Sequence, residues 1–301
     1  MKTIKVGSDF SGVGAFDFAI NRVADQKGFK VENVFACDWD KFARQSYLAN
    51  HKEPGYYPHD VYERDVPEEP LDVYMSSPPC QGFSICGSRK SKDDDKRNIL
   101  FYNSHEFIKK NNPRYFIFEN VTGLISHDNG NTFQEWINLL GGKSVNGLPV
   151  LFPHSESVPY HIYHKVLNSK NYGIPQNRKR IFIIGIRDNI DNNFKFPKKQ
   201  NLNKTLKDIL TIKCKEAFSI SGNDYSNTLR VGGKGSKTKK HSCDVIIVDK
   251  KQHSFSSREL FRLQDFDDSF KFVVSDAQLY KQAGNSITIK VLEKILLNIN
   301  L

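Results

Sequence analysis

Short apolar strands alternate with helical periodicity along the first part of the chain. Residues 2–10 alternate apolar and polar positions, and apolar residues then recur at helical spacing from 15 to 23. The same patterns predict strands at 31–36, 71–75, 115–118, 161–167 and 181–186, and one that ends at 59–61. They also predict helices at 99–107, at 133–140, at 256–264 and near the end, through Leu296. This alternation indicates a doubly wound, Rossmann-like α/β fold.

The composition changes after Asp188. Asn and Lys dominate as far as Lys215, and the alternation of strands and helices is lost. We therefore expect a domain boundary near residue 190, followed by a smaller, irregular domain. Residues 141–159 are rich in Gly, Pro and Ser and predict a long loop within the first domain.

The turn after the first strand, Phe10-Ser11-Gly12-Val13-Gly14, is a candidate cofactor site. Glycine lets a ligand approach the backbone near the positive end of the following helix. The full G-x-G-x-x-G pattern is absent, so a dinucleotide is not favoured. A plain tight turn is the alternative.

Polar residues farther along suit the other parts of a nucleoside. Asp38 ends the second strand, where doubly wound folds hold ribose hydroxyls. Trp39 beside it suits stacking on adenine, with a core aromatic as the alternative. Asp60 suits an exocyclic amine, although by itself a turn residue or helix cap is the better interpretation.

The loop 76–84 presents the candidate nucleophile, Cys80. Pro78 and Pro79 stiffen the backbone after the strand at 71–75, and Gly82 lets the chain turn. Cys80 therefore follows the carboxyl end of a strand, where open α/β sheets bind ligands. A buried or idle cysteine is the alternative.

A carboxylate and a basic segment follow later in the chain. Glu119 comes after the apolar strand 115–118, where burial would raise its pKa and suit a proton donor. A structural glutamate bonded to loop amides is the alternative. Arg178, Lys179 and Arg180 precede the strand 181–186 and suit phosphate or carbonyl contacts, or else a solvated basic loop.

Charge and cysteine content narrow the class of protein. The net charge of +10 and the pI near 9.2 suit a polyanion partner, most simply nucleic acid. The glycine-rich basic loop from Thr228, with Arg230 and Lys234, suits a phosphate backbone, with a solvated loop as the alternative. Five cysteines without a CxxC pair argue against disulfides and structural zinc, so no metal is expected. Without a membrane-length apolar run or a signal peptide, we expect a cytoplasmic protein with no membrane partner.

Taken in order, these motifs resemble the conserved blocks of the DNA (cytosine-5) methyltransferases. Six blocks match: Phe10–Gly14, Pro78–Gln81, Glu119–Val121, Gln176 with Arg178 and Arg180, residues 258–264, and Gly284–Ser286. The resemblance covers nearly the whole chain, with the variable segment between the fourth and fifth blocks. It implies a catalytic domain of residues 1–189 plus 281–301 and a target-recognition domain of residues 190–280.

The resemblance implies methyl transfer from S-adenosylmethionine to carbon 5 of a flipped-out cytosine, with S-adenosylhomocysteine as product. Carbon 5 is a poor nucleophile until a thiolate adds at carbon 6, and Cys80 matches that thiolate. Glu119 matches the acid that stabilises the ring at N3. Arg178 and Arg180 match the remaining catalytic positions, with Arg180 on the ring carbonyl or a nearby phosphate.

The resemblance also implies binding residues and partners. Those for the cofactor are Phe10, Ser11, Gly12, Gly14, Asp38, Trp39, Asp60, Pro79, Leu100, Asn285 and Ser286. Those for DNA are Gln81, Ser84, Thr228, Arg230 and Lys234. We expect a bacterial or phage-encoded monomer that acts on a specific sequence of double-stranded DNA, with a cognate restriction endonuclease as a candidate partner.

Two other functions remain open. An RNA cytosine-5 methyltransferase that acts on transfer RNA would use the same scaffold, but the Cys-Phe-Thr tripeptide of that branch is absent. A non-catalytic DNA-binding module would not need both Cys80 and Glu119. An amino-group methyltransferase is disfavoured, because those enzymes have an aromatic residue after the two prolines.

Overall fold

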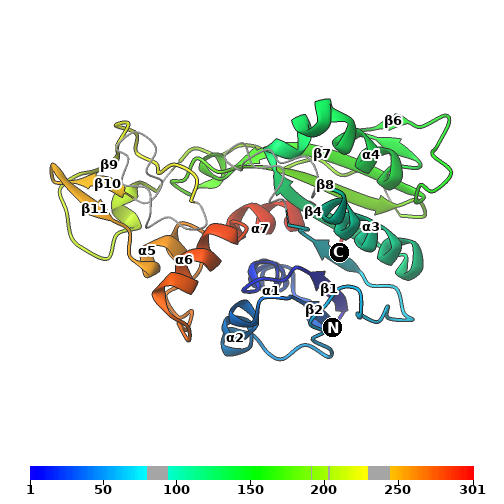
Figure 1. Ribbon diagram of the computed structural model, residues 1–301, viewed down its shortest axis with the longest axis horizontal. Coiled ribbons are helices and arrows are strands. Elements are labelled where there is room, and N and C mark those ends of the chain that lie inside the picture. Colours follow the sequence, from blue (N-terminus) through cyan, green and yellow to red (C-terminus); the bar gives the residue numbers. More distant parts are fainter. Residues whose placement is uncertain (80–93, 191, 203, 230–244) are drawn as a thin grey trace.

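The computed structural model describes residues 1–79, 94–190, 192–202, 204–229 and 245–301, with only the backbone for residues 94–99 (Figure 1). Its largest element is an eight-stranded sheet in the order β2-β1-β3-β4-β8-β7-β5-β6. The strands are β1 (Thr3–Asp9), β2 (Lys30–Cys37), β3 (Val73–Ser76), β4 (Tyr115–Val121), β5 (Ser144–Val145), β6 (Leu148–Pro149), β7 (Tyr160–Asn168) and β8 (Lys179–Arg187).

The first four strands are parallel, and they set the position of the site. β1 pairs in parallel with β2 and with β3, and β3 pairs in parallel with β4. β8 then runs antiparallel to β4, and β7 antiparallel to β8. The carboxyl ends of β1 to β4 therefore meet at one edge of the sheet, where such folds bind ligands.

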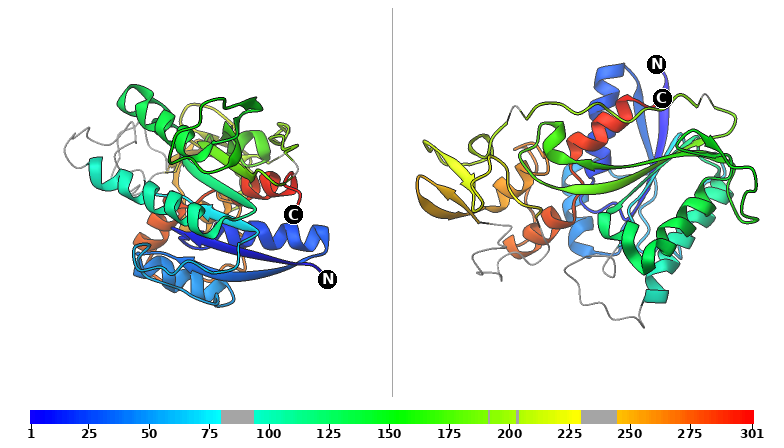
Figure 2. Two further views of the ribbon diagram at one scale, coloured as in Figure 1. Left: turned by 90° about the vertical axis from the view of Figure 1, so that its right-hand side faces the viewer. Right: turned by 90° about the horizontal axis from the view of Figure 1, so that it is seen from above.

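Helices cover both faces of the sheet (Figures 1 and 2). α1 (Ala15–Lys27) and α7 (Ile289–Leu297) lie together on one face, and α3 (Asp94–Asn111) and α4 (Asn131–Leu140) lie on the other. Alternation along β4 explains the two layers, because successive strand residues point to opposite faces. Ile117 packs in the core with α1 and α7, whereas Phe116 and Phe118 pack in the core with α3 and α4. The predicted doubly wound α/β fold is confirmed.

A smaller part lies at one end of the molecule (Figure 1). It contains η3 (Leu206–Asp208) and a three-stranded sheet of β9 (Ala217–Ser219), β10 (Val245–Val248) and β11 (Lys251–Ser254), followed by α5 (Ser257–Arg262) and α6 (Asp276–Asn285). The apolar core around α1 and α7 continues into this part through Leu206, Leu229 and Phe255. The division into residues 1–189 plus 281–301 and residues 190–280 stays a prediction.

Three local predictions need correction. Residues 59–61 form no strand; Oδ1 of Asp60 accepts a hydrogen bond from the Tyr62 N–H at 3.0 Å, a local bond that favours a turn over a sheet ladder. The predicted loop 141–159 contains β5 and β6, which extend the sheet. The strand predicted at 115–118 continues to Val121, so Glu119 lies within it rather than after it.

Polar caps set the starts of two helices. α2 (Lys41–Asn50), which the hydrophobic pattern did not predict, begins after Asp40, whose Oδ1 accepts from the N–H groups of Phe42 and Ala43. α5, within the helix predicted at 256–264, is capped by Ser256 in a capping box with Glu259. Two 3₁₀ segments follow β4 and β7: η1 (Thr122–Gly130), whose backbone is non-helical at residues 127–129, and η2 (Ser169–Tyr172). Within the described ranges, no helix combines the length and apolar character needed to cross a bilayer.

Candidate active site

The turn between β1 and α1 has a conformation that favours glycine. Phe10, Gly12 and Gly14 all have positive φ, at 56°, 57° and 82°. A Cβ atom on Gly12 would meet no heavy atom within 4 Å, so this backbone borders open space. A Cβ on Gly14 would collide with the His51 ring. Gly14 is therefore needed for packing, whereas Gly12 leaves room beside the backbone for a ligand.

Asp38 holds this turn against the end of β2. Its Oδ2 accepts from the Gly12 N–H at 2.7 Å, and its Oδ1 accepts from the Asp40 N–H at 2.8 Å. Burial raises the pKa of the Asp38 carboxyl, and the two amides oppose that rise. The Ser11 N–H also donates to the Cys37 carbonyl at 2.9 Å. Asp38 therefore holds the turn in place. It also lies at the position where the sequence analysis expects a contact to the ribose.

Trp39 and Asp60 lie on loops beside that turn. The Trp39 side chain is 72% exposed, which excludes the core-aromatic alternative and leaves the indole accessible to a planar ligand. The His59 ring touches the indole edge, with 5.7 Å between ring centroids. The Asp60 carboxylate accepts the Tyr62 N–H, and it forms no other side-chain hydrogen bond with a residue that the structure describes. The structure therefore brings both predicted adenine residues to the same side of the molecule as the turn.

Glu119 and Arg180 form an ion pair between β4 and β8. Glu119 is directly opposite Phe182, and Arg180 comes two residues before Phe182 on β8, so the side chains of Glu119 and Arg180 share one face of the sheet. Nε of Arg180 lies 3.0 Å from Oε1 of Glu119, with the side chains 14% and 10% exposed. Oε2 of Glu119 accepts no hydrogen bond from any residue that the structure describes. Burial raises the pKa of Glu119, and Arg180 and Arg178 only partly offset that rise.

The loop that leads toward Cys80 lies beside this pair. Ser76 of β3 is opposite Phe118 of β4, and Nδ2 of Asn120 donates to the Pro78 carbonyl at 3.4 Å. Pro79 is exposed. Cys80, Gln81 and Ser84 lie outside the described residues, so their predicted roles stay predictions. The start of the loop is nevertheless fixed next to Glu119, because Asn120, the next residue of β4, binds the Pro78 carbonyl.

Arg178 is a buried cation that binds backbone carbonyls. Its side-chain nitrogens donate to the carbonyls of Leu229, Gly284 and Ser286 at 3.2, 3.0 and 2.7 Å. Burial lowers its pKa, the positive charge of Arg180 lowers it further, and Glu119 opposes the change. Arg178 therefore joins the start of β8 to the segment before residue 230 and to the end of α6. The contacts show that Arg178 has structural partners, and its predicted catalytic role stays a prediction.

The remaining residues predicted to bind the cofactor lie on α3 and at the end of α6. Leu100 of α3 is half-buried against the core that contains Phe101. Asn285 is exposed at the end of α6, and Ser286 is buried next to it. Nζ of Lys281, also in α6, lies 2.5 Å from Oδ2 of Asp40, so the end of the chain returns to the segment beside Trp39.

The residues predicted to bind DNA are only partly described. Oγ1 of Thr228 donates to the Asn177 carbonyl at 2.6 Å, so this hydroxyl already has a structural partner. Arg230 and Lys234 lie outside the described ranges, and their roles stay predictions. No cluster of three or more metal-ligating side chains occurs in the described part of the chain.

One buried network near the turn was missing from the sequence analysis. Asp9 ends β1, and its Oδ1 accepts from Nε of Arg64 at 2.8 Å. Its Oδ2 accepts from the Tyr74 hydroxyl at 2.5 Å. In the sequence, Asp9 is only a charged residue at the end of a strand of alternating apolar and polar positions, and its partners lie 55 and 65 residues farther along.

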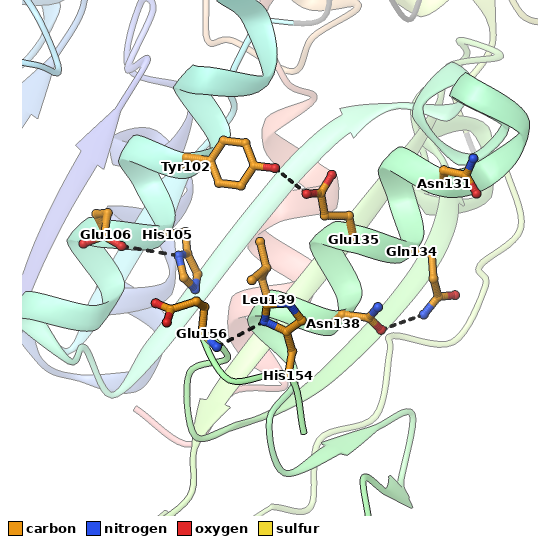
Figure 3. A pocket seen from close by; sticks show the side chains of 10 residues that line it. All are labelled: Tyr102, His105, Glu106, Asn131, Gln134, Glu135, Asn138, Leu139, His154 and Glu156. Carbon is orange, nitrogen blue, oxygen red and sulfur yellow. Dashed lines mark hydrogen bonds and ion pairs between the residues drawn. The ribbon is translucent and has the colours of Figure 1, made fainter. Parts of the chain in front are cut away.

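A cavity of about 410 Å³ has a lining that includes none of the predicted site residues (Figure 3). It lies between α3, α4 and the segment around His154, and it is lined by Tyr102, His105, Glu106, Asn131, Gln134, Glu135, Asn138, Leu139, His154 and Glu156. Its three acidic residues all have partners: Glu135 accepts from Tyr102, and both Glu156 and Glu106 pair with Lys109. The size of this cavity therefore does not identify it as the reaction site.

The fold and the site together define a class of protein: an open α/β fold with a glycine-containing turn beside open space and a buried carboxyl of raised pKa at the same edge of the sheet. Comparison with known proteins defines it further. The family model for C-5 cytosine-specific DNA methylase matches residues 4–243 and 219–300. The chain therefore belongs to this family, whose members methylate cytosine in DNA at carbon 5.

Individual relatives and structures agree with this assignment. The chain is 31% identical to the type II methyltransferase M.NgoBI of Neisseria gonorrhoeae, over 94% of this chain and 89% of the relative. It is 31% identical to M.HhaI of Haemophilus parahaemolyticus, over 96% of this chain and 92% of the relative. A putative DNA modification methyltransferase from an E. coli prophage superposes with a TM-score of 0.68 at 20% identity and 98% coverage of both chains. The S. pombe Dnmt2 methyltransferase superposes with a TM-score of 0.65 at 17% identity and 97% coverage of both, which shows the shared fold.

Proposed function

We propose that this enzyme transfers a methyl group from S-adenosylmethionine to carbon 5 of a flipped-out cytosine in a specific duplex sequence, through a covalent adduct with Cys80. The observation that carries the proposal is the state of Glu119. Its carboxyl is buried with a raised pKa, one oxygen is held by Arg180, and the other has no partner in the described structure. A buried carboxyl in that state can keep a proton near neutral pH and donate it.

The residues around the glycine turn fit the proposed cofactor. Open space beside Gly12 and the exposed face of Trp39 suit a flat nucleoside that approaches the backbone. Asp38 is half-buried, and a carboxylate oxygen can accept a ribose hydroxyl as well as an amide. When bound, S-adenosylmethionine supplies an activated methyl group on a sulfonium sulfur. Phe10, Ser11, Gly14, Asp60, Pro79, Leu100, Asn285 and Ser286 complete the proposed cofactor site.

Each catalytic residue has a separate task in this proposal. The Cys80 thiolate adds to carbon 6 of cytosine, which places negative charge on the ring and makes carbon 5 nucleophilic. Glu119 donates its proton at ring N3 and so stabilises that charge. Arg180 keeps the Glu119 carboxyl in place through Oε1, and Oε2 remains available for the ring. After carbon 5 is methylated, a water molecule accepts the carbon 5 proton, the bond to Cys80 breaks to return the thiolate, and the N3 proton returns to Glu119.

The basic second part is proposed to hold the DNA. Rotating a base out of the duplex costs about a few kcal/mol, which contacts to the backbone and flanking bases must offset. Gln81, Ser84, Thr228, Arg230 and Lys234 are the proposed contacts, and the net charge of +10 supports binding to a polyanion. The type II names of the bacterial relatives favour a role in restriction and modification. We accordingly propose a cytoplasmic monomer with a cognate restriction endonuclease as partner.

Trapping the adduct tests this proposal. Bisulfite sequencing of DNA from cells that express the protein first identifies the methylated sequence. The purified enzyme is then incubated with S-adenosylmethionine and a duplex that carries 5-fluorocytosine at that site. We expect a denaturant-resistant adduct for the wild type and none for Cys80→Ser, which should still bind the duplex. An equal adduct with Cys80→Ser, or methyl transfer to transfer RNA alone, would contradict the proposal.

A further inference from the structure

Arg64 lies buried between the two loops proposed to hold the adenosine. Its side chain is 2% exposed, and Nε donates to Oδ1 of Asp9 at 2.8 Å. Nη2 donates to Oδ1 of Asn103 at 2.9 Å. The guanidinium also lies over the Phe107 ring, 4.3 Å from its centroid. Burying a guanidinium is costly unless hydrogen-bond partners satisfy it. Arg64 therefore requires Asp9 and Asn103 to stay in fixed positions around it.

On one side, this network fixes the glycine turn. Asp9 directly precedes Phe10, the first residue of the turn with positive φ. Its second oxygen accepts from the Tyr74 hydroxyl, and Tyr74 belongs to β3, the strand that leads to Pro78. A shift of the Asp9 carboxylate would therefore move the start of the turn relative to β3.

On the other side, the network fixes the loop that contains Asp60. Asn103 of α3 accepts from Arg64, and its Nδ2 donates to the Val61 carbonyl at 3.1 Å. Val61 directly follows Asp60, and Arg64 itself lies four residues after Asp60. One guanidinium thus connects the turn after β1, the loop around Asp60 and the helix α3.

From these contacts we propose that Arg64 is a positioning residue for cofactor binding. It holds the Phe10 turn and the Asp60 loop at a fixed separation before the ligand arrives, which lowers the cost of organising the site on binding. This inference rests on the proposed use of S-adenosylmethionine. It assigns to Arg64 and Asn103 an effect on cofactor affinity, although neither residue needs to touch the cofactor.

A second asparagine on the same helix provides a matched control. Asn111 of α3 is 2% exposed, and its Nδ2 donates to the carbonyls of Pro67 and Glu69 at 2.9 and 3.0 Å. Its Oδ1 accepts from the Leu71 N–H at 3.0 Å. Asn103 and Asn111 therefore both attach α3 to the 61–71 segment, but only Asn103 contacts Arg64 and the residue next to Asp60.

The test measures binding of S-adenosylhomocysteine to the full chain by calorimetry, together with thermal unfolding. The variants are Arg64→Lys, Asn103→Ala and Asn111→Ala, since lysine keeps the charge of Arg64 but cannot reach two partners in the same geometry. For Arg64→Lys and Asn103→Ala we expect Kd to rise about tenfold, equivalent to about 1.4 kcal/mol. The KM for S-adenosylmethionine should rise similarly, while the KM for DNA stays unchanged.

Asn111→Ala should lower the melting temperature about as much as Asn103→Ala and leave Kd within about twofold of the wild type. If Asn103→Ala and Arg64→Lys bind as tightly as the wild type, or if Asn111→Ala weakens binding equally, Arg64 is only a structural residue and the inference is wrong. If the wild-type protein itself fails to bind S-adenosylhomocysteine, the proposed function is wrong and this inference falls with it.

Discussion

Asp9 and Glu119 are both buried carboxylates near the carboxyl ends of the parallel strands, but they differ in their hydrogen bonds. Burial raises the pKa of each. Both oxygens of Asp9 are occupied, one by Arg64 and the other by Tyr74. In Glu119, Arg180 occupies Oε1, and no described residue occupies Oε2.

Asp9, with both oxygens bound, therefore stabilises the fold, whereas Glu119 has an oxygen that can take part in a reaction. A buried charge is tolerated when partners satisfy it, as for Asp9. A buried carboxyl with an unused oxygen destabilises the fold unless that oxygen has a ligand, and functional sites commonly carry such a cost. The comparison therefore predicts opposite outcomes for similar substitutions at the two positions.

The largest effect we expect is on the reaction rate of Glu119→Gln. Glutamine has the shape of the protonated acid but cannot donate an acidic proton, so the methyl-transfer rate should fall about 10³-fold, within the usual range for general acid catalysis. Single-turnover methylation with labelled cofactor measures this rate. The control is Asp9→Asn, assayed at a temperature where it remains folded, which should lose far less of the rate constant at saturating cofactor. A near wild-type rate for Glu119→Gln would remove Glu119 from the mechanism.

The second effect is on stability, where Asp9→Asn should have a larger effect than Glu119→Gln. Asp9→Asn removes the carboxylate that pairs with the buried Arg64 guanidinium, and removing one partner of such a pair costs about 3 kcal/mol or more. Burial favours the neutral, protonated form of Glu119, which glutamine resembles in shape and charge, so the free energy of unfolding of Glu119→Gln should change much less. Urea unfolding at pH 7 measures both. Equal destabilisation of the two variants would show that the two carboxylates do not differ as described.

The sequence was sufficient for features that depend on neighbouring residues. Strand and helix periodicity predicted the doubly wound sheet, and the glycines of the turn indicated its unusual backbone. It was not sufficient for Arg64, because no local pattern links it to a carboxylate 55 residues earlier. Arg178 and Arg180 show the same limit: they are two residues apart, Arg178 just before β8 and Arg180 in it, yet one binds three carbonyls and the other binds Glu119. Those partners follow from sheet register and chain packing, which spacing does not contain.

The smallest effect we expect is the pH dependence of stability that Glu119 contributes. Because its pKa is higher in the folded protein than in the unfolded chain, the folded state binds this proton more tightly. Its stabilising contribution is complete below the unfolded pKa and is lost as pH rises through the folded pKa. As pH rises from the unfolded pKa to the folded pKa, the free energy of unfolding of the wild type should therefore fall relative to that of Glu119→Gln. Above the folded pKa, the difference between the two proteins should stay constant. Urea unfolding of both proteins from mildly acidic to neutral pH tests the sign; a difference that grows in favour of the wild type with rising pH would mean that Arg180 outweighs burial and that Glu119 is ionised when the reaction begins.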